Sequence, residues 1–140
     1  MTESRYDSGM KVRKEVLGSE YVEQAQARTT EFDVDFQRFI TETAWGSLWS
    51  RPDLDRRTRS LVTIAILAAL GREELTVHLR AAICNVGVDP HEIAEVLIHV
   101  AVYAGVPAAN AAFSVAKKVI DQYVPASEGT DSTKESQEDV

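Results

Sequence analysis

The chain of 140 residues suits one domain with one core, and its mix of 44% hydrophobic and 26% charged residues is typical of a globular protein. Its formal net charge of -7 argues against a nucleic-acid partner, because basic patches carry that affinity. Cys84 is the only cysteine, so no internal disulfide can form and a reducing, cytoplasmic compartment is expected. The longest apolar stretch, LVTIAILAAL at 61–70, is too short to span a bilayer, and the first residues lack a signal-peptide pattern.

The N-terminal half of the sequence predicts short helices. Apolar residues recur at helical spacing almost throughout, so we expect an all-α, compact single-domain bundle of about six to seven helices. A first helix over about 5–17 should end at Gly18, and Ser19 should cap a second that runs to about Ala27. Thr30 should cap a third helix, with an apolar stripe that leads towards two tryptophans and consists of Phe32, Phe36, Phe39, Ile40 and Thr43.

The C-terminal half predicts longer helices, the first of which should be the buried centre of the fold. Asp55 can cap this helix, which is apolar on all sides after Ser60 and reaches Gly71. A further helix is expected over 72–86. Asp89 should cap the next helix, with Pro90 at its first position and Glu92 completing a capping box, and this helix should run to about Gly105. A last helix is expected from Pro107 to about Val124. The helical domain should therefore span 1–124, and the acidic segment 125–140 should be a disordered tail.

Glu74 and His78 lie four residues apart in the helix expected over 72–86, and therefore on one face. A helical wheel places them between two apolar arcs, which predicts that both side chains point into an apolar environment. The pair is then an inert core pair, half of a metal site or an acid/base pair for proton transfer. The metal site is disfavoured, because zinc needs three or four ligands and no HExxH or CxxC motif is present. Glu95 and His99 share this spacing, which is too little to indicate a repeat.

Four arginines surround the start of the helix that Asp55 caps: Arg51, Arg56, Arg57 and Arg59. They form either a local salt-bridge network or an anion site, because guanidinium groups and free backbone N–H groups suit a carboxylate. Arg59 is expected to be the buried member, with Arg56 and Arg57 at the rim.

Four further side chains bear on function. Trp45 and Trp49 are expected either to pack in the core or to form a pocket wall that excludes water. Tyr103 either packs in the core or points its hydroxyl into a cavity. Cys84 falls near the solvent side of its helix and has no neighbour in sequence that would activate a nucleophile.

Four segments together resemble the carboxymuconolactone decarboxylase family: RYDSGMKVRKEVLG, AWGSLWSRPDLDRRTRSLVTIAIL, EELTVHLRAA and YAGVPAANAAF. The resemblance runs from about Arg5 to Val124. The wider superfamily includes alkylhydroperoxidase D-like proteins, which carry Cys-x-x-Cys-x-x-x-His. The histidine of that motif matches His78, whereas its two cysteines fall on Gly71 and Glu74, so disulfide-based peroxidase chemistry is not expected.

The resemblance implies an all-helical subunit in a homo-oligomer, commonly a ring-like hexamer. It also implies a carboxy-lyase without cofactor or metal, acting on a small dicarboxylate lactone in the β-ketoadipate pathway of aromatic catabolism. In such a reaction His78 would donate a proton with Glu74 orienting it, or the two roles would be reversed. The candidates for binding substrate are Arg59, Arg51, Arg57, Trp45 and Tyr103. The alternatives are an isomerase, hydrolase or peroxidase on the same scaffold, or a non-catalytic helical oligomer.

Overall fold

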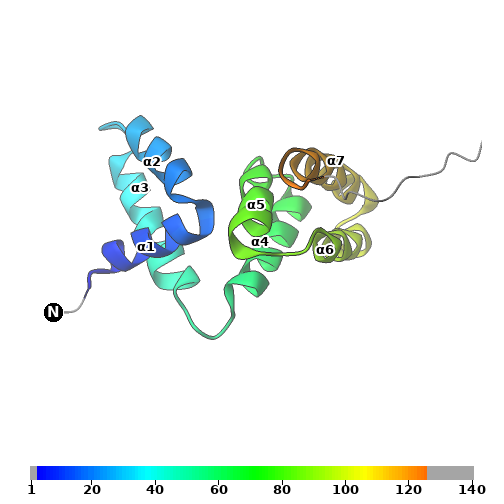
Figure 1. Ribbon diagram of the computed structural model, residues 1–140, viewed down its shortest axis with the longest axis horizontal. Coiled ribbons are helices and arrows are strands. Elements are labelled where there is room, and N and C mark those ends of the chain that lie inside the picture. Colours follow the sequence, from blue (N-terminus) through cyan, green and yellow to red (C-terminus); the bar gives the residue numbers. More distant parts are fainter. Residues whose placement is uncertain (1–2, 126–140) are drawn as a thin grey trace, which may run out of the picture.

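The computed structural model describes residues 3–125 and is helical over most of that range, with no strand in it (Figure 1). None of the helices in this range is both long and apolar enough to cross a membrane. The expected acidic tail, 125–140, lies almost wholly outside the described residues. The elements are α1 (Arg5–Leu17), α2 (Ser19–Arg28), α3 (Val34–Ile40), the π-helix η1 (Thr41–Trp49), α4 (Arg56–Leu70), α5 (Leu75–Ala81), the π-helix η2 (Ala82–Val86), α6 (Pro90–Tyr103) and α7 (Val106–Tyr123). The predicted all-α fold is confirmed.

Local capping signals fix where several helices begin. The Asp55 carboxylate accepts a hydrogen bond from the backbone N–H of Thr58 at 2.7 Å, and Asp89 accepts one from the N–H of His91 at 2.8 Å. Pro90 follows at the first helical position of α6, where a missing N–H costs nothing. The predicted starts of α4 and α6 are therefore confirmed. They could be predicted because each start depends only on a few neighbouring residues.

Two predicted helix starts are wrong by three residues, and Ser19, expected as the cap of the second helix, is its first residue and follows the N-cap Gly18. The third helix begins at Val34 and not after Thr30, because the Asp33 carboxylate accepts the N–H of Thr30 at 2.7 Å and closes a turn before the helix. The helix expected over 72–86 begins only at Leu75. Gly71 ends α4 in the left-handed conformation (φ 65°), and the chain turns before α5 starts.

The helices form two groups, each with its own apolar cluster (Figure 1). The larger cluster joins α4, α5, α6 and α7 around Ile64, Leu79 and Leu97, all fully buried. The smaller joins α1, α2 and η1, and it reaches α5 through Ala81. Because α5 takes part in both clusters, its side chains lie where the two groups meet.

Two glycines allow α1 and η1 to pack at very close range. A Cβ atom on Gly9 would overlap the carbonyl oxygen of Thr41 and lie 2.8 Å from the backbone nitrogen of Gly46. A Cβ atom on Gly46 would lie 2.5 Å from the carbonyl oxygen of Arg5. Only glycine fits at such backbone contacts. This contact fixes the position of η1, and therefore of the two tryptophans that it carries.

One face of α4 and the aromatic stripe before η1 are exposed. Ile64 and Ala68 of α4 are buried, but Val62, Ile66 and Leu70 are not, so the prediction that α4 is buried on all sides is wrong for this face. The side chains of Phe32, Phe36 and Phe39 are 99%, 59% and 61% exposed. Phe36 and Phe39 lie on α3, as the predicted stripe requires, but Phe32 lies in the turn before that helix. These apolar side chains are not covered by other parts of the described chain.

Candidate active site

The π-helix η1 carries two tryptophans whose rings stack on one another. Trp45 and Trp49 are both buried, with 5.1 Å between ring centroids and 28° between ring planes. Residues four apart lie on nearly the same side of a helix, which brings the two indoles together. Of the two expectations, the structure confirms that both residues pack in the core, where they belong to the smaller apolar cluster.

The imidazole of His78, on α5, lies against both indoles. Its centroid is 6.4 Å from that of Trp45, with 8° between the planes, and 6.3 Å from that of Trp49, with 20°. This largely buried position lowers the pKa of His78 below its ordinary value of 6.5, because burial disfavours the charged form; the negative charge of Glu74 opposes this to a lesser degree. At neutral pH the free protein therefore carries a neutral imidazole here.

Glu74 does not share this apolar environment. Its side chain is exposed, so the prediction that both members of the pair point inward is wrong for Glu74. The reason is the later start of α5: Glu74 is the N-cap residue, at the end of the turn after Gly71, and the helical wheel drawn for 72–86 does not apply to it. Glu74 therefore acts on His78 through its charge, from the solvent side.

Arg59 is the buried arginine of the cluster, as predicted. Its side chain is 8% exposed; its Nη2 donates to the carbonyl oxygen of Arg51 at 3.3 Å, and its Nε has no hydrogen-bond partner among the described residues. The guanidinium thus keeps donor capacity for another acceptor.

The other three arginines are exposed and each is paired with a carboxylate. Arg51 pairs with Asp53 at 3.2 Å and Arg56 with Glu15 at 2.6 Å. Arg57 pairs with Glu92, to which its Nε donates at 3.1 Å. The salt-bridge interpretation holds for these three arginines. Arg51 could contact a substrate only if its ion pair with Asp53 broke, and Arg57 only if its ion pair with Glu92 broke.

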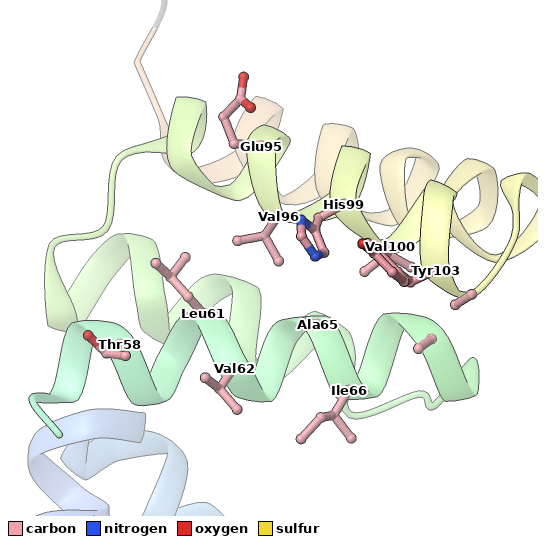
Figure 2. A pocket seen from close by; sticks show the side chains of 12 residues that line it. Thr58, Leu61, Val62, Ala65, Ile66, Glu95, Val96, His99, Val100 and Tyr103 are labelled. Carbon is pink, nitrogen blue, oxygen red and sulfur yellow. The ribbon is translucent and has the colours of Figure 1, made fainter. Parts of the chain in front are cut away.

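Tyr103 lies apart from these residues, in a cavity of about 710 Å³ between α4 and α6 (Figure 2). Its ring is 81% exposed and stacks on His99, with 4.9 Å between centroids. In Figure 2, both rings lie in the space between the two helices, whereas Glu95 points away from α4. The cavity wall is mainly apolar, with Leu61, Val62, Ile66 and Val96 among its residues.

Sequence reasoning did not assign His99 or Glu95 to a site. The available signal was the second Glu-x-x-x-His spacing, but the spacing does not say which helix faces a cavity. None of Trp45, Arg59, Glu74 and His78 lines this cavity. Of the predicted site residues, Tyr103 therefore lies at the α4/α6 cavity, apart from the residues around His78.

Within residues 3–125, no three His, Cys, Asp or Glu side chains gather as metal ligands. Cys84 is exposed, as predicted.

Comparison with known proteins identifies a matching family and similar proteins. The model of the carboxymuconolactone decarboxylase family matches residues 35–118, which include η1, α4 and α5. The chain is 52% identical to a 4-carboxymuconolactone decarboxylase of Acinetobacter baylyi, over 84% of this chain and 87% of that protein. It is 48% identical to the nitrosuccinic acid decarboxylase npaB of Metarhizium robertsii, over 85% of this chain and 83% of that one. The chain therefore belongs to the carboxymuconolactone decarboxylase family.

Proposed function

We propose that this protein is a carboxy-lyase that converts 4-carboxymuconolactone to β-ketoadipate enol-lactone and CO2 in protocatechuate catabolism, without a cofactor. The observation that carries the proposal is the 52% identity to a decarboxylase of that name over 84% of the chain. Trp45, Arg59 and His78 lie within residues 35–118, which the family model matches.

The substrate itself supplies the electron sink for this reaction. When the bond between the ring carbon and its carboxylate breaks, CO2 leaves and the electron pair moves through the ring double bond onto the lactone carbonyl. The resulting dienolate takes up a proton on the carbon next to that carbonyl. The protein must therefore hold a carboxylate, stabilise the negative oxygen and deliver one proton.

Arg59 is suited to the first of these tasks. A buried guanidinium with an unused Nε–H offers a directional, charge-assisted contact to a carboxylate. The carbonyl of Arg51 holds one side of the group and so fixes its orientation. Arg51 and Arg57 remain candidates for the second carboxylate, at the cost of their exposed ion pairs. Tyr103 opens onto the α4/α6 cavity and has no part in the site proposed around His78.

His78 is the proposed proton donor. It is neutral in the free protein at pH 7, since burial lowers its pKa. A bound dianionic substrate would raise that pKa, because an opposite charge nearby favours the imidazolium. The proton would then be present on His78 when the dienolate forms, and the charge of Glu74 would add to the effect. The indoles of Trp45 and Trp49 would keep water from the imidazole.

We further propose that the protein is a cytoplasmic homo-oligomer, with a hexamer as the expected form. The support is the exposed apolar surface of α3, of the turn before it and of α4, which includes Phe32, Phe36, Phe39, Val62 and Ile66. Monomers rarely expose apolar surface on this scale. Light scattering or sedimentation at several protein concentrations measures the oligomer directly.

A second candidate substrate is nitrosuccinic acid, because the fungal decarboxylase named for it is 48% identical to this chain. That compound carries two carboxyl groups and a nitro group, which can accept the electron pair that CO2 leaves behind. The two substrates therefore make the same demand on the protein: an anchored carboxylate and a proton for a stabilised carbanion.

The test is to incubate the protein with freshly generated 4-carboxymuconolactone or with nitrosuccinic acid, and to measure CO2 release and product mass. We expect CO2 and the enol-lactone from the first compound. An isomer, a hydrolysed product of higher mass or no reaction would refute the proposed reaction. CO2 from nitrosuccinic acid alone would assign the second substrate.

A further inference from the structure

A polar pocket in the N-terminal group of helices takes no part in the reaction proposed above. It has a volume of about 370 Å³ and lies between α1, α2, α3 and the start of η1. Its polar wall includes Arg13, Gln26, Gln37 and Arg38, and its apolar wall includes Met10 and Val34. It shares no lining residue with the α4/α6 cavity, and neither His78 nor Arg59 lines it.

Arg13 is a buried cation with only neutral partners in this pocket. Its side chain is 6% exposed. Nη1 donates to the Thr41 hydroxyl at 3.2 Å and Nη2 to the Gln37 amide oxygen at 3.3 Å, while Nε has no partner among the described residues. A guanidinium has five N–H donors, so donor capacity is left over.

No carboxylate neutralises Arg13 within residues 3–125, where its guanidinium forms no ion pair. The acidic side chain on the adjoining helix, Glu42, is paired with Arg38 at 3.3 Å. Burial without a counter-charge is unfavourable, and it lowers the pKa of Arg13 from its ordinary value; weaker charge effects of Tyr21 and Tyr6 oppose this. An anion bound in the pocket would remove this unfavourable state.

The rest of the wall suits a small organic anion. Arg38, although paired with Glu42, also lines the pocket, and its guanidinium lies 5.5 Å from the centroid of the Tyr6 ring on the same wall. Met10 and Val34 add apolar surface for a carbon skeleton, and the volume is within the range of small-molecule sites. Tyr6, Met10 and Arg13 recur at i, i+4 and i+7, so α1 presents them on one face.

We propose that the pocket between α1, α2 and α3 binds a small organic carboxylate, with the buried guanidinium of Arg13 as its principal partner. A planar fork of N–H donors matches the two oxygens of a carboxylate. The inference does not rest on the proposed function, because its test measures binding and requires no turnover.

The experiment is calorimetric titration of the full chain with three probes: succinate, uncharged succinamide and inorganic phosphate. The variants are Arg13→Met, which removes the charge, and Val34→Trp, which fills the half-exposed edge of the pocket and leaves Arg13 in place. Arg28→Gln is the matched control, because it removes an exposed cation of α2 that does not line the pocket. Circular dichroism establishes that each variant is folded.

We expect saturable succinate binding in the wild type and in Arg28→Gln, weaker phosphate binding, and no binding of succinamide. Succinate should bind at least about tenfold more weakly to Arg13→Met, which corresponds to loss of one charge-assisted contact. Val34→Trp should weaken succinate binding at least as much, because the indole occupies the pocket. If Arg13→Met does not fold, succinate binding to Val34→Trp tests the proposal alone. The proposal is overturned if the wild type binds no succinate, if phosphate binds as tightly as succinate, or if Val34→Trp binds succinate normally. It is also overturned if Arg59→Met abolishes binding while Val34→Trp does not, since the anion then occupies the His78 region.

Discussion

The imidazole of His78 lies almost parallel to the indole of Trp45, with 6.4 Å between the ring centroids and 8° between the planes. Trp49 lies at a similar distance. Aromatic neighbours remove water from the imidazole but supply no hydrogen-bond acceptor for a second proton. The consequence is a histidine whose protonation is disfavoured, since burial lowers its pKa, and this affects both stability and turnover.

Acid should destabilise the fold partly through His78. The folded-state pKa is lowered, so the unfolded chain binds more protons at His78 at acidic pH. The contribution of this residue to stability is therefore full above the unfolded pKa of about 6.5 and is lost as the pH falls below it. We expect His78→Gln to lose less unfolding free energy than the wild type between about pH 7.5 and pH 5.

Urea unfolding at several pH values measures this difference. The control is His91→Gln, which removes an exposed imidazole and should keep the acid sensitivity of the wild type. Equal losses of stability in wild type and His78→Gln would show that His78 is not held in its neutral form.

Arg59→Met should weaken substrate binding. The substitution keeps the bulk of the side chain but removes the guanidinium with its unpaired Nε, and a loss of about 2–4 kcal/mol in transition-state stabilisation is the scale for a buried charged contact. The matched control is Arg56→Met, which breaks only an exposed ion pair with Glu15. The measurement is kcat/KM with 4-carboxymuconolactone for the wild type and both variants. A wild-type value in a folded Arg59→Met protein would show that Arg59 does not belong to the site.

Chelators should leave turnover unchanged. The family resemblance implies a reaction without a metal, and the Glu74/His78 pair supplies too few ligands for a zinc site. The measurement is activity after prolonged dialysis against chelator, with a zinc enzyme treated in parallel. Loss of activity that one divalent ion restores would refute the prediction.

Gly9→Ala should separate α1 from η1. The added methyl group would meet the backbone of Thr41 and Gly46, which cannot move aside as a side chain can. We expect a destabilisation of at least about 1–3 kcal/mol, the usual cost of overpacking, and a shift in tryptophan fluorescence because η1 carries both indoles. Ser8→Ala, one residue away, is the control. Unchanged stability and fluorescence would mean that the contact is not rigid.

The sequence predicted best what depends on neighbouring residues. The starts of α4 and α6 follow from Asp55 and Asp89, whose side chains cap the adjacent backbone. The burial of Arg59 followed from its place on the apolar stripe of one helix. Glu74 was misplaced because the wheel assumed one helix over 72–86, and Gly71 with the turn after it moves the helix start by three residues.

Features that depend on contacts between distant segments could not be predicted. The two π-helices have no sequence signal of their own, and η1 packs where Gly9 and Gly46 let two backbones approach. The Tyr103–His99 cavity exists only because α6 lies beside α4. The periodicity of Phe32, Phe36 and Phe39 indicated an apolar face but not whether its partner belongs to the same chain.

The roles of His78 and Glu74 are separated by the pH dependence of kcat. His78→Gln should fold but lose about 10² to 10⁴ in kcat, since glutamine fills a similar volume and cannot deliver a proton. Glu74→Gln should cost less, because the exposed carboxylate acts on the imidazole through charge. Its negative charge raises the pKa of His78, so its removal should lower that pKa and move the alkaline limb of the kcat profile to lower pH. The shift should shrink at high salt, where the charge of an exposed group is screened.

Glu73→Gln, which removes the neighbouring exposed charge, is the matched control. A folded His78→Gln protein with normal turnover would make the histidine structural, and a greater loss in Glu74→Gln would make the carboxylic acid the proton donor.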